Sequence, residues 1–129
     1  MSTRSTIALE FADGTVQQVY CHSDGYLEGV GDTLCRSFTN PFALRDLIDL
    51  GDMSYIGAPY SLSGENCPPN KFEDLTDYFL NCQQEEYDYI LRNIDDKPVW
   101  FVRCWETKGV WVPFNKAVEM IDQQRAQEY

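Results

Sequence analysis

The segment VYCHSDGY, residues 19–26, holds the residue types in this chain that come closest to a chemical site. His22 is the only histidine, Cys21 directly precedes it, and Asp24 follows two residues later. A cysteine beside a histidine can form a nucleophile and its base, and His22 with Asp24 and one distant cysteine could ligate a metal ion. Adjacent side chains of a strand point to opposite faces, however, so Cys21 and His22 cannot pair while the chain is extended. The chain also lacks a second histidine for either site, so we interpret the segment as a strand end followed by a turn at Asp24 and Gly25.

Gly25, Gly29 and Gly31 resemble a phosphate-binding loop only in their composition. They lack the lysine and the glycine order of such loops, and Glu28 and Asp32 would repel a phosphate. The five cysteines are an odd number without a closely spaced pair, which is untypical of a disulfide scaffold or a zinc site. We therefore predict no catalytic residue, no metal site and no cofactor.

Charge is the strongest signal in the composition. The net charge is −11; residues 1–96 carry 17 acidic and 5 basic side chains, whereas residues 97–129 carry 4 acidic and 5 basic ones. A protein that binds DNA or RNA through its phosphates needs a basic surface, so we expect no direct binding of nucleic acid. An acidic surface can instead attract a basic partner from a distance.

The acids concentrate between residues 73 and 96, where Arg92 is the only basic residue. If the elements that carry these acids lie side by side, they form a band of carboxylates that fits a groove built for phosphates. The residues predicted to contact such a partner are Glu73, Asp74, Asp77, Glu85, Glu86, Asp88, Asp95 and Asp96. The alternative is an acidic surface that only keeps the protein in solution.

Periodicity predicts the elements of the N-terminal half. Residues 5–11 and 16–21 alternate in hydrophobicity around an Asp-Gly pair, which predicts a β-hairpin. Apolar residues spaced by three and four predict a helix over residues 27–38. A second helix is predicted between Asn40, an N-cap followed by proline, and Gly51, a C-cap. Its expected apolar stripe is Phe42, Leu44, Leu47, Ile48 and Leu50.

Weaker signals follow in the middle of the chain. Residues 53–56 predict a short strand, and the proline- and glycine-rich residues 57–70 predict a loop. A short helix is predicted next over residues 72–80, with acids near its N-terminus. Its shared apolar face would be Phe72, Leu75 and Phe79.

The last third predicts an antiparallel meander of three strands, at residues 87–94, 99–105 and 110–114, and a C-terminal helix capped by Asn115. Residues 1–129 are therefore predicted to form a single α+β domain. No apolar run reaches the roughly 18 residues of a membrane helix, and the N-terminus has no apolar signal-peptide core. We expect a cytoplasmic protein that makes no contact with a membrane.

The sequence TRSTIALEFADGTVQQVYCHSDGYLEGVG, residues 3–31, resembles a family of small uncharacterised proteins of bacteriophages, prophages and plasmids. Its members share an R-S-T-I strand, a D-G turn, the motif V-Y-C-H-x-D-G-Y and a helix start with glycines, and the resemblance extends over roughly residues 3–57. Members often have an aromatic residue where this chain has Ser23, which changes what packs over the turn. The resemblance implies an accessory protein of a mobile element, many of which act on host defence. It implies no enzyme activity and assigns no functional residue.

Charge and resemblance together suggest a non-enzymatic protein that binds and inhibits a host nucleic-acid-handling complex through its acidic surface. A CRISPR effector is the first candidate target and a restriction system the second. Three alternatives stay open: a protein that binds nucleotide signals in a pocket under the loop at 57–70, an enzyme that uses Cys21 or His22, and a structural protein. In the last case the aromatic C-terminal sheet would form a homodimer interface.

Overall fold

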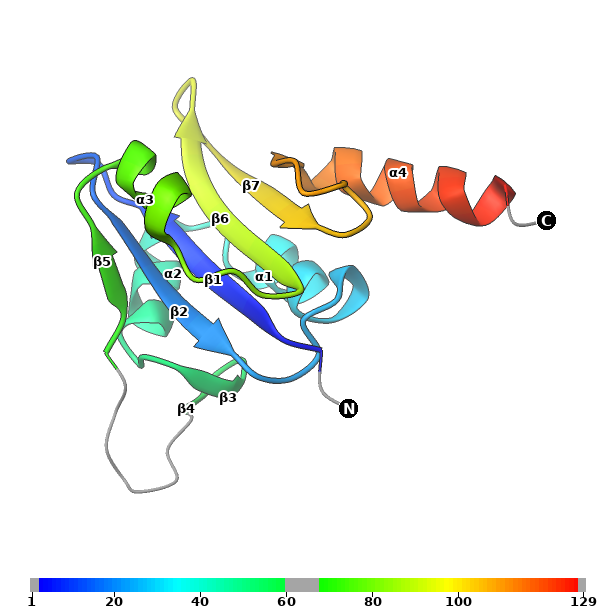
Figure 1. Cartoon of the computed structure of the whole chain (residues 1–129). Coiled ribbons are helices and arrows are strands. Elements are labelled where there is room, and N and C mark those ends of the chain that lie inside the picture. The colour runs from blue at the N-terminus through cyan, green and yellow to red at the C-terminus, as the bar shows by residue number, and fades with distance from the viewer. Residues whose placement is uncertain (1–2, 60–67, 128–129) are drawn as a thin grey trace.

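The computed structural model describes residues 3–59 and 68–127, which form one mixed sheet with helices on both of its faces (Figure 1). The strands are β1 (Ser5–Glu10), β2 (Val16–Cys21), β3 (Met53–Tyr55), β4 (Ala58–Pro59), β5 (Asn70–Phe72), β6 (Tyr87–Ile94), β7 (Lys97–Cys104) and β8 (Val112–Pro113). Neighbouring strands follow the order β4-β3-β2-β1-β6-β7-β8, and β5 pairs with β2 beside this path. The predicted α+β class is confirmed. Residues 60–67 of the predicted loop lie outside the described part of the chain.

The predicted N-terminal hairpin is confirmed as β1 and β2, which pair antiparallel from Ser5 opposite Cys21 to Glu10 opposite Val16. Its turn is held by Asp13, whose carboxylate accepts hydrogen bonds from the backbone N–H (3.0 Å) and hydroxyl (2.6 Å) of Thr15. Gly14 has a φ of +91°, which an L side chain rarely adopts. The Asp-Gly pair therefore sets the register of the hairpin.

The predicted meander of β6, β7 and β8 joins the hairpin through a parallel pairing of β1 with β6. This pairing places β1 at the centre of the sheet, where its first five residues are buried on both faces. Ile7 and Leu9 contribute to one core, and Ala8 between them contributes to the other. The third strand of the meander is shorter than predicted, because only Val112–Pro113 pair with β7.

The larger core lies under η1 (Leu27–Gly31), α1 (Asp32–Ser37) and α2 (Pro41–Ile48), where η1 is a turn of π-helix. Asn40 caps α2 as predicted, because its side chain accepts a hydrogen bond from the Phe42 backbone N–H at 2.9 Å. The predicted apolar stripe is only partly buried: Leu44, Leu47 and Ile48 enter the core, while Phe42 is 74% exposed. Leu50 is also exposed.

The smaller core lies under α3 (Leu75–Asn81), on the other face of the sheet. The prediction of a helix from residue 72 is wrong at its start: Phe72 ends β5, opposite Val16 of β2. The helix begins later because the Asp74 carboxylate accepts a hydrogen bond from the Asp77 backbone N–H at 2.7 Å and acts as its N-cap. As a consequence Tyr78, rather than Phe79, is the fully buried aromatic residue of α3.

The C-terminal helix α4 (Phe114–Gln127) follows β8 directly and extends away from the sheet (Figure 1). Asn115 was predicted to cap it, but the helix begins one residue earlier, so Asn115 lies inside the first turn. Ala117 is buried against the larger core and holds the first turns of α4 in place. Within residues 3–59 and 68–127, no helix has the length and apolar character of a membrane span.

Candidate protein-interaction site

The segment VYCHSDGY ends β2 and forms a turn, as predicted. Cys21 is fully buried in the larger core, and burial raises the pKa of its thiol, so the reactive thiolate is disfavoured at neutral pH. The His22 ring lies partly exposed, with its Nδ1 atom 2.6 Å from the Tyr20 hydroxyl. Asp24 adopts a φ of +58°, and the Gly25 N–H donates a hydrogen bond to the Thr3 carbonyl at 2.9 Å. These contacts tie the turn to the start of β1.

A metal site was not predicted. Among the described residues, no group of three or more histidine, cysteine, aspartate or glutamate side chains is arranged to hold a metal ion.

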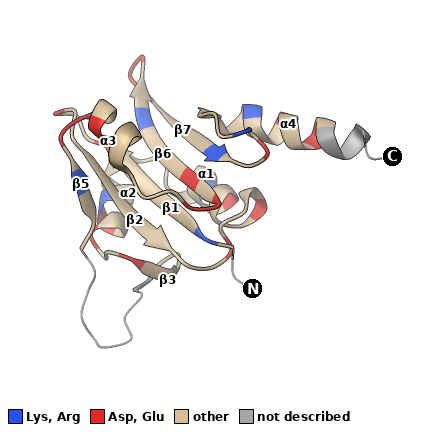
Figure 2. Cartoon of the chain, viewed as in Figure 1, with Lys and Arg blue, Asp and Glu red and all other residues tan. Residues whose placement is uncertain are grey.

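Most of the predicted contact residues gather at one end of the sheet. Because β1 and β6 are parallel, the β1–β2 turn and the β6–β7 turn leave the sheet at the same end. The antiparallel pairing of β5 with β2 brings the β5–α3 connection to this end as well. Figure 2 shows acidic residues at these connections. We define the acidic end by its six members, Asp13, Glu73, Asp74, Asp77, Asp95 and Asp96.

The carboxylates of the acidic end are presented to solvent. Asp77 is partly exposed, and the five other members are exposed. No member forms an ion pair within the described residues. The hydrogen bonds from Thr15 lower the pKa of Asp13, which keeps its side chain ionised. The basic residues nearest to these connections in sequence are Lys71 and Lys97. Six carboxylates therefore outnumber two lysines, and the net charge of these connections is negative.

The backbone conformation fixes the position of two residues of the acidic end. Asp95 and Asp96 form the two-residue turn between β6 and β7, and both have positive φ values, +53° and +64°. Two central residues with positive φ are typical of a type I′ turn, whose twist matches that of the flanking strands. The turn therefore places both residues at the tip of a hairpin whose two strands have eight residues each.

The other three predicted residues do not join the acidic end. Glu85, Glu86 and Asp88 lie at the start of β6, whereas Asp95 follows its last residue. At 3.3 Å per residue, the length of β6 places Glu86 about 30 Å from Asp95. The single band that the sequence predicted is therefore divided into two groups at opposite ends of one strand.

Asp88 is not available to a partner, because its side chain is only 1% exposed. Its carboxylate accepts hydrogen bonds from the Thr6 hydroxyl at 2.7 Å and the Glu85 backbone N–H at 3.1 Å, and it forms an ion pair with Arg103 at 3.1 Å. Burial raises the pKa of the Asp88 carboxyl, since the loss of hydration outweighs these stabilising contacts. Asp88 therefore belongs to the interior of the fold, where it joins β6 to β1 and β7.

Above Asp88 and Arg103 lies a hollow of about 470 Å³. Glu85 and Glu86 line it, and so does Trp105, which is 83% exposed. Exposed tryptophans are over-represented among the residues that dominate binding energy at protein interfaces. A tryptophan face beside carboxylates suits the side chain of an arginine or lysine, through a cation–π contact and an ion pair.

Sequence reasoning missed two members of these surfaces, Asp13 and Trp105. The sequence predicts Asp13 only as part of a turn. The parallel pairing of β1 with β6, which puts this turn at the same end of the sheet as Asp95, has no short-range signal in the sequence. The sequence predicts Trp105 only as the last residue of the strand 99–105, whereas in the structure it directly follows β7. Its neighbours in sequence, Cys104 and Glu106, do not indicate that it is exposed.

By its fold and these surfaces, the chain is an acidic α+β protein with exposed carboxylates at both ends of the β6–β7 hairpin. No family model matches the chain, and comparison with curated proteins and with solved structures gives no match. A function is therefore inferred from the chemistry of the protein's own surface.

Proposed function

We propose that the protein binds a basic, nucleic-acid-binding groove of a host defence complex in the bacterial cytoplasm and inhibits that complex without catalysis. A CRISPR effector is the first candidate and a restriction system the second. The observation that carries the proposal is the acidic end, where three separate connections bring six carboxylates together on a rigid sheet.

The charge of this surface suits a groove that evolved to hold phosphates. A groove lined by lysine and arginine attracts carboxylates over about a Debye length and speeds their association, with a strong dependence on salt. Asp95 and Asp96 stand on a turn of defined backbone conformation, so binding there does not need to order the backbone.

The separation of the two acidic groups supports the same partner. The distance of about 30 Å between Glu86 and Asp95 is close to the length of one turn of duplex, about 34 Å. A partner groove that holds one turn of nucleic acid could contact the acidic end and the hollow beside Trp105 at once. The exposed tryptophan would then add apolar contact to a surface otherwise governed by charge.

A matched pair of variants tests the proposal. The acidic-end variant carries Glu73→Gln, Asp95→Asn and Asp96→Asn, amide replacements that keep side-chain shape and, at 95 and 96, tolerate positive φ. The distant variant carries Asp46→Asn, Asp49→Asn and Glu119→Gln, which are exposed acids on α2, just after it and on α4. Both variants remove three negative charges.

The measurement is target-DNA binding and cleavage by purified, guide-loaded CRISPR effectors of several types and by restriction enzymes, with increasing amounts of each variant. We expect the natural sequence and the distant variant to inhibit one of these complexes, and the acidic-end variant to inhibit it at least about tenfold less well. Equal inhibition by the two variants would contradict an acidic mimic of nucleic acid. The absence of inhibition across the whole panel would contradict the proposed class of target.

A further inference from the structure

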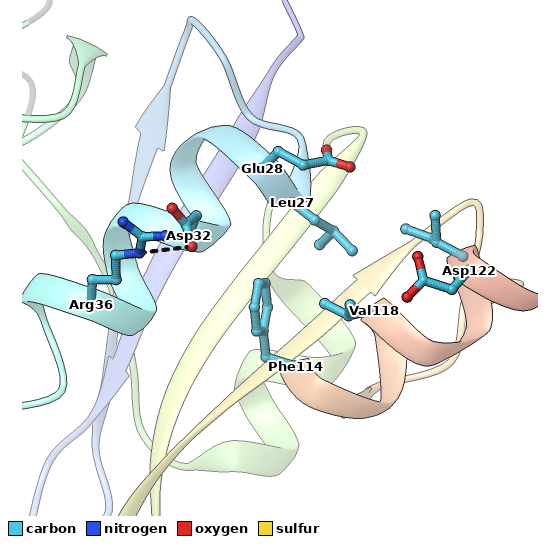
Figure 3. Close-up of a pocket in the computed structure, with 8 residues that line it drawn as sticks. Leu27, Glu28, Asp32, Arg36, Phe114, Val118 and Asp122 are labelled. Atoms are coloured by element: carbon cyan, nitrogen blue, oxygen red, sulfur yellow. Dashed lines mark ion pairs between the residues drawn. The ribbon is translucent and has the colours of Figure 1, made fainter. Parts of the chain in front are cut away.

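A groove of about 330 Å³ lies between α4 and the segment formed by η1 and α1 (Figure 3). It shares no residue with the acidic end or with the hollow beside Trp105. Its lining is Leu27, Glu28, Asp32, Arg36, Phe114, Val118, Ile121 and Asp122. Its volume is within the range of about 300–1,000 Å³ that small-molecule sites occupy.

The floor of the groove is apolar. Phe114, Val118 and Ile121 are spaced by four and three residues, so they share one face of α4. Figure 3 shows Phe114 and Val118 pointing toward Leu27 of η1 across the groove. Val118 is 37% exposed, although valine is among the residue types most often buried.

Close packing at one side fixes the width of the groove. A Cβ atom added to Gly31 would lie 2.7 Å from Cε2 of Phe114, so the ring of Phe114 rests directly on the backbone at the end of η1. The turn of π-helix that ends at Gly31 is itself a rare form that occurs frequently at functional sites. The groove is therefore held by backbone contact and does not need a ligand to form.

The rim of the groove is acidic. Glu28, Asp32 and Asp122 supply three carboxylates, and Arg36 supplies one guanidinium, which forms an ion pair with Asp32 at 3.1 Å. Figure 3 places Asp122 on α4 with its carboxylate facing the gap between the helices. An apolar floor below a rim with excess negative charge disfavours phosphates and nucleotides and favours a cation with an apolar body.

The size of the groove decides between a small ligand and a protein partner. Eight residues line it, whereas a stable protein interface uses about 20–30 residues on each side. We propose that this groove binds a small organic cation, an alkylammonium or arylammonium ion, with its apolar body against Leu27, Phe114 and Val118 and its charge near Asp122. This site is independent of the proposed inhibition of a host complex.

Three probes of matched shape or charge test the site in the unaltered protein. They are 4-phenylbutylammonium, 4-phenylbutyrate, which has the same body and the opposite charge, and tetramethylammonium, which has charge with little apolar body. Backbone amide shifts measured by NMR at about 150 mM salt report both affinity and position. We expect saturable shifts at η1 and the first turns of α4 with 4-phenylbutylammonium, and affinities at least about tenfold weaker for the other two, which is about 1.4 kcal/mol.

A pair of valine substitutions gives a second test. Val118→Lys places a positive charge in the groove on an exposed helical position, whereas Val110→Lys makes the same change at an exposed residue outside it. We expect Val118→Lys to abolish binding of 4-phenylbutylammonium and Val110→Lys to leave it unchanged. Equal binding by both variants, shifts confined to other parts of the molecule, or equal affinity for 4-phenylbutyrate would overturn the proposal.

Discussion

Asp88 has the chemistry of a contact residue and the surroundings of a core residue. Its carboxylate accepts a hydrogen bond from the Thr6 hydroxyl of β1 and pairs with Arg103 of β7, so one side chain links three neighbouring strands. The Arg103 guanidinium also lies over the ring of Trp111, 4.7 Å from the ring centre. A buried charge of this kind is tolerated because each partner satisfies the other, and losing either partner leaves an unpaired charge.

Arg103→Met should therefore be strongly destabilising. Methionine fills much of the volume of the arginine side chain but leaves Asp88 buried without its counter-charge. We expect the free energy of unfolding to fall by about 3 kcal/mol or more at about pH 7, measured by urea titration. Arg36→Met is the control: its ion pair with Asp32 on the surface of α1 joins side chains that are 77% and 44% exposed, so its loss should cost less than about 0.5 kcal/mol.

The pH dependence of the stability of Arg103→Met follows from the protonation of Asp88. Burial already raises the pKa of Asp88, and removal of Arg103 raises it further. A carboxyl whose pKa is higher in the folded state binds its proton more tightly there, so its stabilising contribution is present below the unfolded pKa and is lost as the pH rises through the folded pKa. The loss in free energy of unfolding caused by Arg103→Met should therefore become smaller as the pH falls from about 7 to about 4. A deficit equal to that of Arg36→Met, or constant with pH, would contradict this role of Asp88.

Local sequence signals predict a helix or a turn correctly where one residue type controls the backbone. The Asp-Gly turn of the first hairpin and the Asn40 cap of α2 were predicted correctly, because each depends on hydrogen bonds within two residues in sequence. The start of α3 was missed because Phe72 continues the apolar spacing of the helix, while its pairing with Val16 depends on a strand far away in the sequence. Periodicity cannot decide between helix and strand for so short an apolar pattern.

Two asparagines were predicted to cap helices, and the prediction is correct for one and wrong for the other. Asn40 accepts a hydrogen bond from the Phe42 N–H at the start of α2, whereas Asn115 lies within the first turn of α4. We expect Asn40→Ala to lower the free energy of unfolding by about 1 kcal/mol and Asn115→Ala to change it by less than about 0.5 kcal/mol. Chemical denaturation of the two variants under the same conditions measures the difference. A larger cost at Asn115 would restore the cap that the sequence suggested and contradict the observed start of α4.

Across the whole molecule, the sequence predicted a concentration of acidic residues but not how the fold distributes them. Glu86 and Asp95 are nine positions apart in the chain, and only an extended β6 carries them to opposite ends of the sheet. Conversely, Asp13 and Asp95 are distant in sequence, and the parallel pairing of β1 with β6 places their turns at the same end. Pairing between strands that are far apart in sequence has no short-range signal, so the two acidic groups could be separated only in three dimensions.

The acidic end should lower the stability of the folded protein. Six carboxylates without ion pairs among the described residues repel one another, and bound cations or salt relieve that repulsion. We expect the acidic-end variant to unfold a few degrees higher than the natural sequence at about 20 mM salt, and the difference to shrink at about 500 mM salt. The distant variant should gain less, since its three acids do not share one end of the sheet.

Stability and inhibition should then change in opposite directions in the acidic-end variant. Natural proteins commonly retain destabilising groups where function needs them, so a variant that gains thermal stability and loses inhibition indicates that these charges serve a partner. Thermal unfolding monitored by circular dichroism, beside the inhibition assay, measures both quantities on the same sample. If the two triple variants gained the same stability at low salt, the repulsion would belong to the net charge of the whole molecule, and the acidic end would not be a concentrated electrostatic site.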